Sequence, residues 1–239
     1  MRIRHSHLLA AAALFASAGN SAVHIAIPWL VLEITGSSAN AGVVLGISGF
    51  SVIFSAPLIG GLIAVLGARP VSIWADIISA GSVILFPIVG TLFGLNLASL
   101  LIIAIVGALF DPAGATARKS LIQAVAERDG LSLLKFNGTY EAAATIGTVI
   151  GPTGAALAIG FVGINATFYL IAIVFLLASC LAFFIPVVTT HDRSEESFSI
   201  SNVFKETRIG MNALWRDKPL LSLVGLYTLL TAIYMPVES

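Results

Sequence analysis

The stretch GTVIGPTGAAL, residues 147–157, places a proline among small and apolar residues, and its second half has a counterpart earlier in the chain. The segment 152–157 (PTGAAL) reads Pro-x-x-small-small-Leu, as does 57–62 (PLIGGL). Both lie in apolar runs of the ~20 residues that a helix needs to cross a bilayer. The two helices are predicted to run in opposite directions, as inverted-topology repeats require.

Apolar runs of spanning length recur along the chain, and none of them alternates as a barrel strand does. Helices are the spanning solution that satisfies their backbone polar groups, so we predict an all-α polytopic membrane protein. Seven spans are expected, at Leu8–Leu32, Asn40–Ala64, Val71–Thr91, Leu97–Ala117, Phe136–Gly160, Ala166–Val187 and Pro219–Pro236.

Composition excludes several classes of protein. Of the 239 residues, 58% are hydrophobic and 10% are charged, against roughly 25% charged in a soluble domain. A net charge of zero gives no case for nucleic-acid binding. The single cysteine, Cys180, provides neither a disulfide framework nor a Cys-based metal site. We expect no metal and no cofactor.

Enzyme motifs are weak. The segment 46–49 matches the Gly-x-Ser-Gly of rhomboid proteases, but no later span contains the His that this chemistry needs. The sequence contains no Walker loop, so it gives no indication that this chain pumps with ATP. We therefore predict that the protein is not an enzyme.

The distribution of Lys and Arg predicts the orientation. All twelve fall on one side of the predicted spans, and the loops at about 33–39, 92–96 and 161–165 have none. By the positive-inside rule, a multi-pass protein of the plasma (inner) membrane with a cytoplasmic N-terminus is expected.

Residues 16–18 resemble a signal-peptide cleavage site. Cleavage there would leave too little of the first span to cross, so we expect that span to stay intact.

The chain divides into three parts. Residues 1–187 are predicted to form a six-helix bundle, in which spans one to three and four to six are inverted repeats. Residues 188–218 begin polar and become amphipathic around Val203, Phe204 and Ile209, which predicts a cytoplasmic linker with a helix at the membrane surface. Residues 219–239 are predicted to hold helix seven, the first of a second bundle.

Polar side chains in the first span form one helical stripe of Ser17, Asn20, Ser21 and His24. Such a stripe is expected to face a water-filled cavity, and Asn20 lies near the middle of the span, where transporter substrates bind. These residues are therefore candidates for a substrate cavity. His24 has two interpretations, a proton-sensing group or a satisfied packing residue.

Asp76, Asp111 and Glu141 are acids inside predicted spans, each roughly 9–10 Å from the cationic side at 1.5 Å per residue. They form one predicted layer, edged by Arg69, Arg118, Lys119 and Lys135. One interpretation is a set of inner-gate salt bridges, and the other makes one acid a proton-coupling carboxylate. Asp111, next to Pro112, could instead cap a break in its helix.

Glycines recur at three- or four-residue spacing in two spans, at Gly42, Gly46 and Gly49, and at Gly147 and Gly151. Small residues at this spacing let helix backbones approach closely. Tight packing is the simpler interpretation, and smooth faces that slide during transport are the alternative.

Several stretches together resemble the major facilitator superfamily, in its drug and siderophore exporter branch of macrolide-efflux and enterobactin-exporter types. Gly60, Gly67 and Arg69 match the superfamily's signature in the loop between helices two and three, and Gly147, Gly151 and Pro152 match its antiporter signature. Further stretches at 26–37, 133–137 and 206–210 resemble the end of helix one, the entry to helix five and the approach to helix seven. At the position where the family's loop signature has an acidic residue, this chain has Ala64. In the family that carboxylate helps to latch the cytoplasmic gate, so the same latch is not expected here.

The resemblance implies the six-helix N-terminal bundle of an exporter plus helix seven. It implies proton-coupled efflux of amphipathic small molecules, such as drugs or siderophores, by alternating access. The lipid bilayer, a small-molecule substrate and protons are the implied partners. A C-terminal bundle needed for transport would be missing, so a fragment is expected. The alternative is a non-transporting protein, either a truncated remnant or a half-unit that partners another chain.

Overall fold

The computed structural model describes residues 4–185, except for the side chains at 51–54, 56 and 57, and twelve single residues beyond 185. Those twelve are 203–205, 207–209, 212, 219, 222, 223, 225 and 226, and all are helical. Most of the predicted seventh span, and most of the predicted linker at 188–218, lie outside the described residues.

Each of the six spans predicted before residue 188 corresponds to a long helix, and the described part of the chain contains no strand. The long helices are α1 (His5–Thr35), α2 (Ser38–Leu66), α3 (Ala68–Phe93), α4 (Leu97–Ser120), α6 (Leu133–Val162) and α7 (Ile164–Phe183). Five described stretches, which contain all of these except α2, are long and apolar enough to cross a membrane. At 29 residues, α2 is about 44 Å long, more than the ~30 Å hydrocarbon core.

Two details differ from the prediction. Helix α5 (Ile122–Asp129) was expected to be part of a loop, but it forms because Ile122, Val125 and Ala126 share one buried face. Helix α7 ends at Phe183, earlier than the predicted end of the sixth span at Val187.

Local sequence explains where the helices begin and end. Asn96 starts α4 with a capping box, in which its side chain accepts from the Ser99 amide and the Ser99 hydroxyl accepts from the Asn96 amide. Gly67 joins α2 to α3 at φ 86°, a backbone conformation that L side chains rarely adopt. The connection between α2 and α3 is therefore the single residue Gly67, and its conformation sets the direction in which α3 begins.

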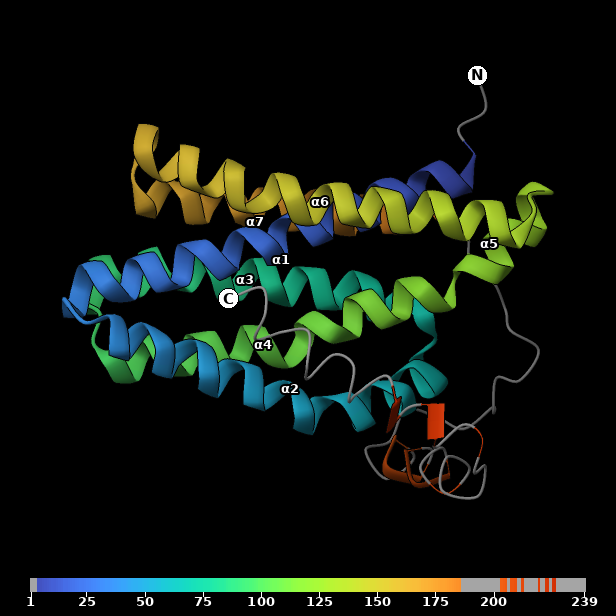
Figure 1. Cartoon of the computed structure of the whole chain (residues 1–239), viewed down its shortest axis with the longest axis horizontal. Helices are drawn as coiled ribbons and strands as arrows, with labels where there is room; N and C mark the ends of the chain where they lie inside the picture. The colour runs from blue at the N-terminus through green and yellow to red at the C-terminus, as the bar shows by residue number, and fades with distance from the viewer. Residues whose placement is uncertain are drawn as a thin grey trace.

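Helix packing follows the predicted inverted repeat (Figure 1). Exchanging the two halves maps α1 onto α4, α2 onto α6 and α3 onto α7. The extensive α1–α6 and α1–α7 interfaces have counterparts in α4–α2 and α4–α3, while α3–α7 maps onto itself. At that central interface the rings of Phe86 and Phe168 stack with centroids 4.9 Å apart.

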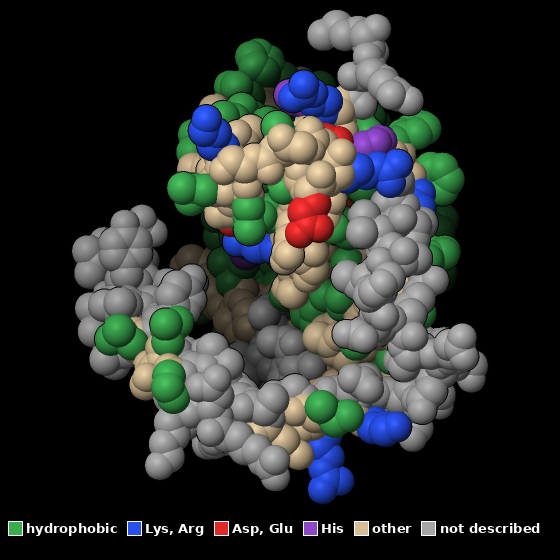
Figure 2. Space-filling model, turned by 90° about the vertical axis from the view of Figure 1, so that its right-hand side faces the viewer, with side chains coloured by type: hydrophobic (Ala, Val, Ile, Leu, Met, Phe, Trp, Pro, Cys, Tyr) green, Lys and Arg blue, Asp and Glu red, His purple; other side chains and the backbone are tan. Residues whose placement is uncertain are grey.

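The two ends of the bundle differ in charge. The α1–α2, α3–α4 and α6–α7 connections lie together at the left of Figure 1, and none of them contains Lys or Arg. Lys and Arg side chains gather at the opposite end, around α5, which faces the viewer in Figure 2. All described cations therefore belong to one end of the bundle, called the cationic end below.

Candidate functional site

A cavity of about 480 Å³ lies between α1, α2, α3 and α4, with Phe175 of α7 on its wall. Its walls are largely apolar. Polar groups reach it from all four helices and include Asn20 and His24 of α1, Ser48 of α2 and Asp111 of α4. A volume of this size is in the range of pockets that hold drug-sized ligands.

Two oxygens at the cavity have no hydrogen-bond partner among the described residues. These are Asn20 Oδ1 and Ser48 Oγ, and both atoms are buried. Buried polar atoms in proteins normally have partners, because an unpaired one costs about 1–3 kcal/mol. In this cavity, water or a ligand can supply the missing hydrogen bonds.

The polar stripe predicted along the first span divides between two faces of α1. Asn20 and His24 line the cavity, and His24 is exposed. Ser17 lies against α6, where a Cβ added to Gly147 would be 3.0 Å from the Ser17 Cβ. Ser21 is half-buried and does not line the cavity.

Asp111 is held at the cavity by α3. The Ser79 hydroxyl donates to Asp111 Oδ1 at 2.7 Å, and both residues line the cavity. Helix α4 runs unbroken through Pro112, so the suggestion that Asp111 caps a helix break is wrong. Its second carboxylate oxygen has no hydrogen bond to another described residue in the structure.

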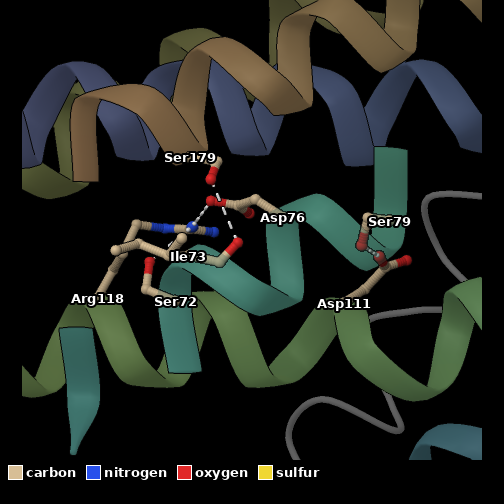
Figure 3. A network of polar contacts seen from close by, with 7 residues as sticks. All are labelled: Ser72, Ile73, Asp76, Ser79, Asp111, Arg118 and Ser179. Atoms are coloured by element: carbon tan, nitrogen blue, oxygen red, sulfur yellow. Dashed lines mark hydrogen bonds and ion pairs between the residues drawn. The ribbon is translucent and has the colours of Figure 1, made fainter. Parts of the chain in front are cut away.

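Asp76 forms a buried ion pair that joins α3 to α4 (Figure 3). Arg118 Nη1 donates to Asp76 Oδ2 at 2.7 Å and to the Ser72 hydroxyl at 3.3 Å. The Ser179 hydroxyl of α7 donates to the carbonyl of Ile73 close by, at 3.3 Å. Asp76 therefore faces a neutralising cation, as the salt-bridge interpretation of the acidic layer requires.

Glu141 lies apart from the other two acids. It pairs with Lys119 at 2.9 Å, with side-chain exposures of 47% for Glu141 and 57% for Lys119. This pair connects α6 to the last turn of α4 near the surface. Of the three acids predicted to share one layer, Asp76 and Asp111 lie on the α3–α4 interface, and Glu141 does not.

Arg69 of the loop signature binds the end of α7. Its guanidinium donates to the carbonyl of Phe183 and lies 5.3 Å from the centroid of that residue's ring. A cation at a helix C-terminus is stabilised by the helix dipole. Gly67 provides the turn before Arg69, whereas Gly60 meets no neighbour that a Cβ would touch.

The glycines of the antiporter-type motif pack α6 directly on α1. A Cβ at Gly147 would collide with the Leu14 carbonyl, and one at Gly151 would collide with the Ala18 carbonyl. Pro152 follows inside α6, which remains continuous. In α2, by contrast, a Cβ at Gly42, Gly46 or Gly49 would meet no described atom within 4 Å.

Sequence reasoning missed three groups of this region. Arg118 was placed at the edge of the acidic layer, but it is buried as the partner of Asp76. Arg118 follows Asp111 by seven residues, so the two lie on one face of α4. This spacing could have indicated that Arg118 faces the protein interior. Ser48 and Ser79 gave no comparable signal, since isolated serines are common in membrane helices.

Comparison of the sequence with known proteins places the chain in a family. The family model described as "Major Facilitator Superfamily" matches residues 9–238. "Multidrug efflux pump Tap" of Mycolicibacterium fortuitum is 33% identical over 235 residues, which are 97% of this chain and 57% of that protein. The protein of the same name in Mycobacterium tuberculosis (strain ATCC 25618 / H37Rv) is 32% identical over 238 residues, 97% of this chain and 56% of the relative. The chain thus spans little more than half the length of these relatives.

Proposed function

The chain belongs to the Major Facilitator Superfamily, and we propose that it forms the first bundle of a secondary transporter that exports amphipathic small molecules, such as drugs or siderophores. The observation that carries the proposal is the cavity of about 480 Å³ between α1, α2, α3 and α4. The wall of this cavity is apolar apart from a few polar groups. Relatives named multidrug efflux pumps support export as the direction of transport.

Alternating access requires a second bundle that rocks against the first around the substrate. Residues 219–239 are proposed to begin it, and residues 188–218 to link the two. The relatives are long enough to contain such a bundle, because the chain covers only 56–57% of them. A protein of the plasma (inner) membrane with a cytoplasmic cationic end is proposed from the positive-inside rule.

The three intramembrane acids are proposed to have two roles. Asp76 is paired with Arg118, and Glu141 with Lys119, so these two acids fit inner-gate contacts between helices. Asp111 faces the cavity, and among the described residues its hydrogen-bond partner is a single hydroxyl, that of Ser79, so we assign it the coupling proton. The described ionisable groups around it are His24 at the same cavity and the Asp76–Arg118 pair on the α3–α4 interface.

The contact of Arg69 with Phe183 is proposed to replace the latch that the loop signature lacks at Ala64. It ties the first turn of α3 to the last residues of α7 at the cationic end. Together with the two ion pairs, it connects α3, α4, α6 and α7 at the proposed inner gate.

Efflux from whole cells tests the proposal. Cells that express the protein from its own gene are loaded with a fluorescent amphipathic dye, and dye loss is followed with and without a protonophore. We expect export that stops when the proton gradient collapses. Export that the protonophore does not affect would contradict proton coupling. Dye loss no faster than in cells lacking the gene would favour a non-transporting membrane protein.

A further inference from the structure

We infer that the cavity between α1 and α4 selects cationic amphipaths, and that Asp111 is the residue that selects them. The inference rests on the proposed function, because it names the substrate class of the same cavity. It narrows that class from amphipathic molecules in general to those that carry a protonated amine.

The first argument is the charge of the cavity wall. Among the described residues that line the cavity, Asp111 is the only acid, and none is Lys or Arg. The nearby guanidinium of Arg118 is engaged by Asp76 and Ser72, 2.7 and 3.3 Å away. Because a charge inside the membrane is costly without a partner, a ligand cation is the complement that the carboxylate lacks.

The second argument is the hydrogen-bonding character of the wall. Among the described residues, Asn20 Oδ1 and Ser48 Oγ are buried without hydrogen-bond partners, and Asp111 has a partner, Ser79, at only one of its oxygens. An amide oxygen and a carboxylate oxygen accept hydrogen bonds, so a ligand with N–H donors matches them. A protonated amine provides both the positive charge and the donors.

The third argument is what the wall would reject. An anionic ligand would place its charge beside Asp111 with no described Lys or Arg to receive it. Unpaired charges of like sign are how binding sites discriminate against a competitor. The remaining wall, which includes Phe86 and Phe175, offers apolar area to the body of the ligand. Anionic siderophores therefore fit this cavity poorly.

Three matched fluorescent ligands separate charge from apolar affinity. Dansylcadaverine ends in an amine, and analogues with the same dansyl group and linker end in a hydroxyl or a carboxylate. Their binding to the purified full-length protein in nanodiscs is followed by the dansyl emission. We expect the amine to bind about tenfold more tightly than the hydroxyl analogue, and the carboxylate to bind most weakly.

Variants locate the preference. Asp111→Asn is expected to remove the amine's advantage while leaving the affinity of the hydroxyl analogue within about twofold, and Asp111→Glu is expected to retain the advantage. Glu127→Gln removes one negative charge from α5, outside the cavity, and is the matched control.

The outcomes separate this inference from the proposed function. Equal binding of all three ligands, or an amine preference that survives Asp111→Asn, overturns cation selection at Asp111 and leaves a substrate cavity intact. Failure of all three ligands to bind the wild-type protein contradicts the cavity as the substrate site, and with it the proposed function. An amine preference lost only in Asp111→Asn supports the inference.

Discussion

Arg118 Nη1 lies 2.7 Å from Asp76 Oδ2, and the side chains of Arg118 and Asp76 are only 3% and 4% exposed. Both charges are therefore removed from solvent, and each stabilises the other. Breaking a buried pair leaves one charge without compensation, whereas replacing both partners by uncharged side chains does not. The ion pair between Asp76 and Arg118 therefore holds α3 and α4 together at the cationic end.

Removing one partner of this pair is predicted to be strongly destabilising. Asp76→Asn and Arg118→Met are each expected to lower the free energy of unfolding by about 3–5 kcal/mol. The double variant is expected to lose much less than the sum, because no unpaired charge remains. Denaturant titration of the four proteins in detergent measures this coupling. Strictly additive losses would contradict the buried pair.

The exposed pair is predicted to matter for gating but little for stability. Glu141→Gln is expected to change the unfolding free energy by less than about 1 kcal/mol, since exposed ion pairs contribute little. If the pair is a gate contact, Glu141→Lys impairs dye efflux and the reversal Lys119→Glu/Glu141→Lys restores it. A reversal that stays inactive although folded would instead support a proton-carrying role for Glu141.

The α1–α6 interface is predicted to tolerate no side chain at its glycines. Gly147→Ala places a methyl group against the Leu14 carbonyl and should cost about 1–3 kcal/mol by forcing the helices apart. Gly154→Ala, on the same helix, meets nothing within 4 Å and is the control. It should be neutral or stabilise α6 by up to about 1 kcal/mol. Similar melting temperatures for both variants would contradict the close packing.

Arg69 is predicted to hold α7 through two separable contacts. Arg69→Gln loses the charged hydrogen bond to the Phe183 carbonyl and the ring contact, and should cost about 2 kcal/mol. Phe183→Leu keeps the carbonyl and should cost about 0.5–1 kcal/mol. Hydrogen exchange at the end of α7 should therefore rise more in Arg69→Gln. Greater exchange in Phe183→Leu would reverse this ranking of the contacts.

The long helices could be predicted from sequence because each is an uninterrupted apolar run with a clear end. Asn96 caps α4, and Gly36 and Gly67 end α1 and α2. The short helix α5 was missed because its eight residues are too few to establish a period against the charged residues around it. Its stability comes from burial against α1 and α6, which only the fold reveals.

The partner of each polar side chain could not be predicted from the sequence, because it depends on how each helix is rotated about its axis. The sequence placed Asp76, Asp111 and Glu141 at similar depths, but depth does not say which neighbour each side chain faces. Ser17 and Asn20 differ by three residues, which places their side chains about 60° apart around the helix. This difference is enough to put Ser17 at the α6 interface and Asn20 at the cavity. Likewise, Gly42 and Gly46 of α2 have the same spacing as Gly147 and Gly151 of α6, yet among the described residues only the α6 pair has another helix in contact.

The most direct test of the central claim is transport of dansylcadaverine into inverted membrane vesicles under an imposed pH gradient, acidic inside. The account predicts uptake that requires the gradient, releases protons from the vesicle lumen, and is lost in Asp111→Asn but not in Glu127→Gln. Uptake that persists without the gradient, or that Asp111→Asn leaves unchanged, would contradict proton-coupled export through this cavity.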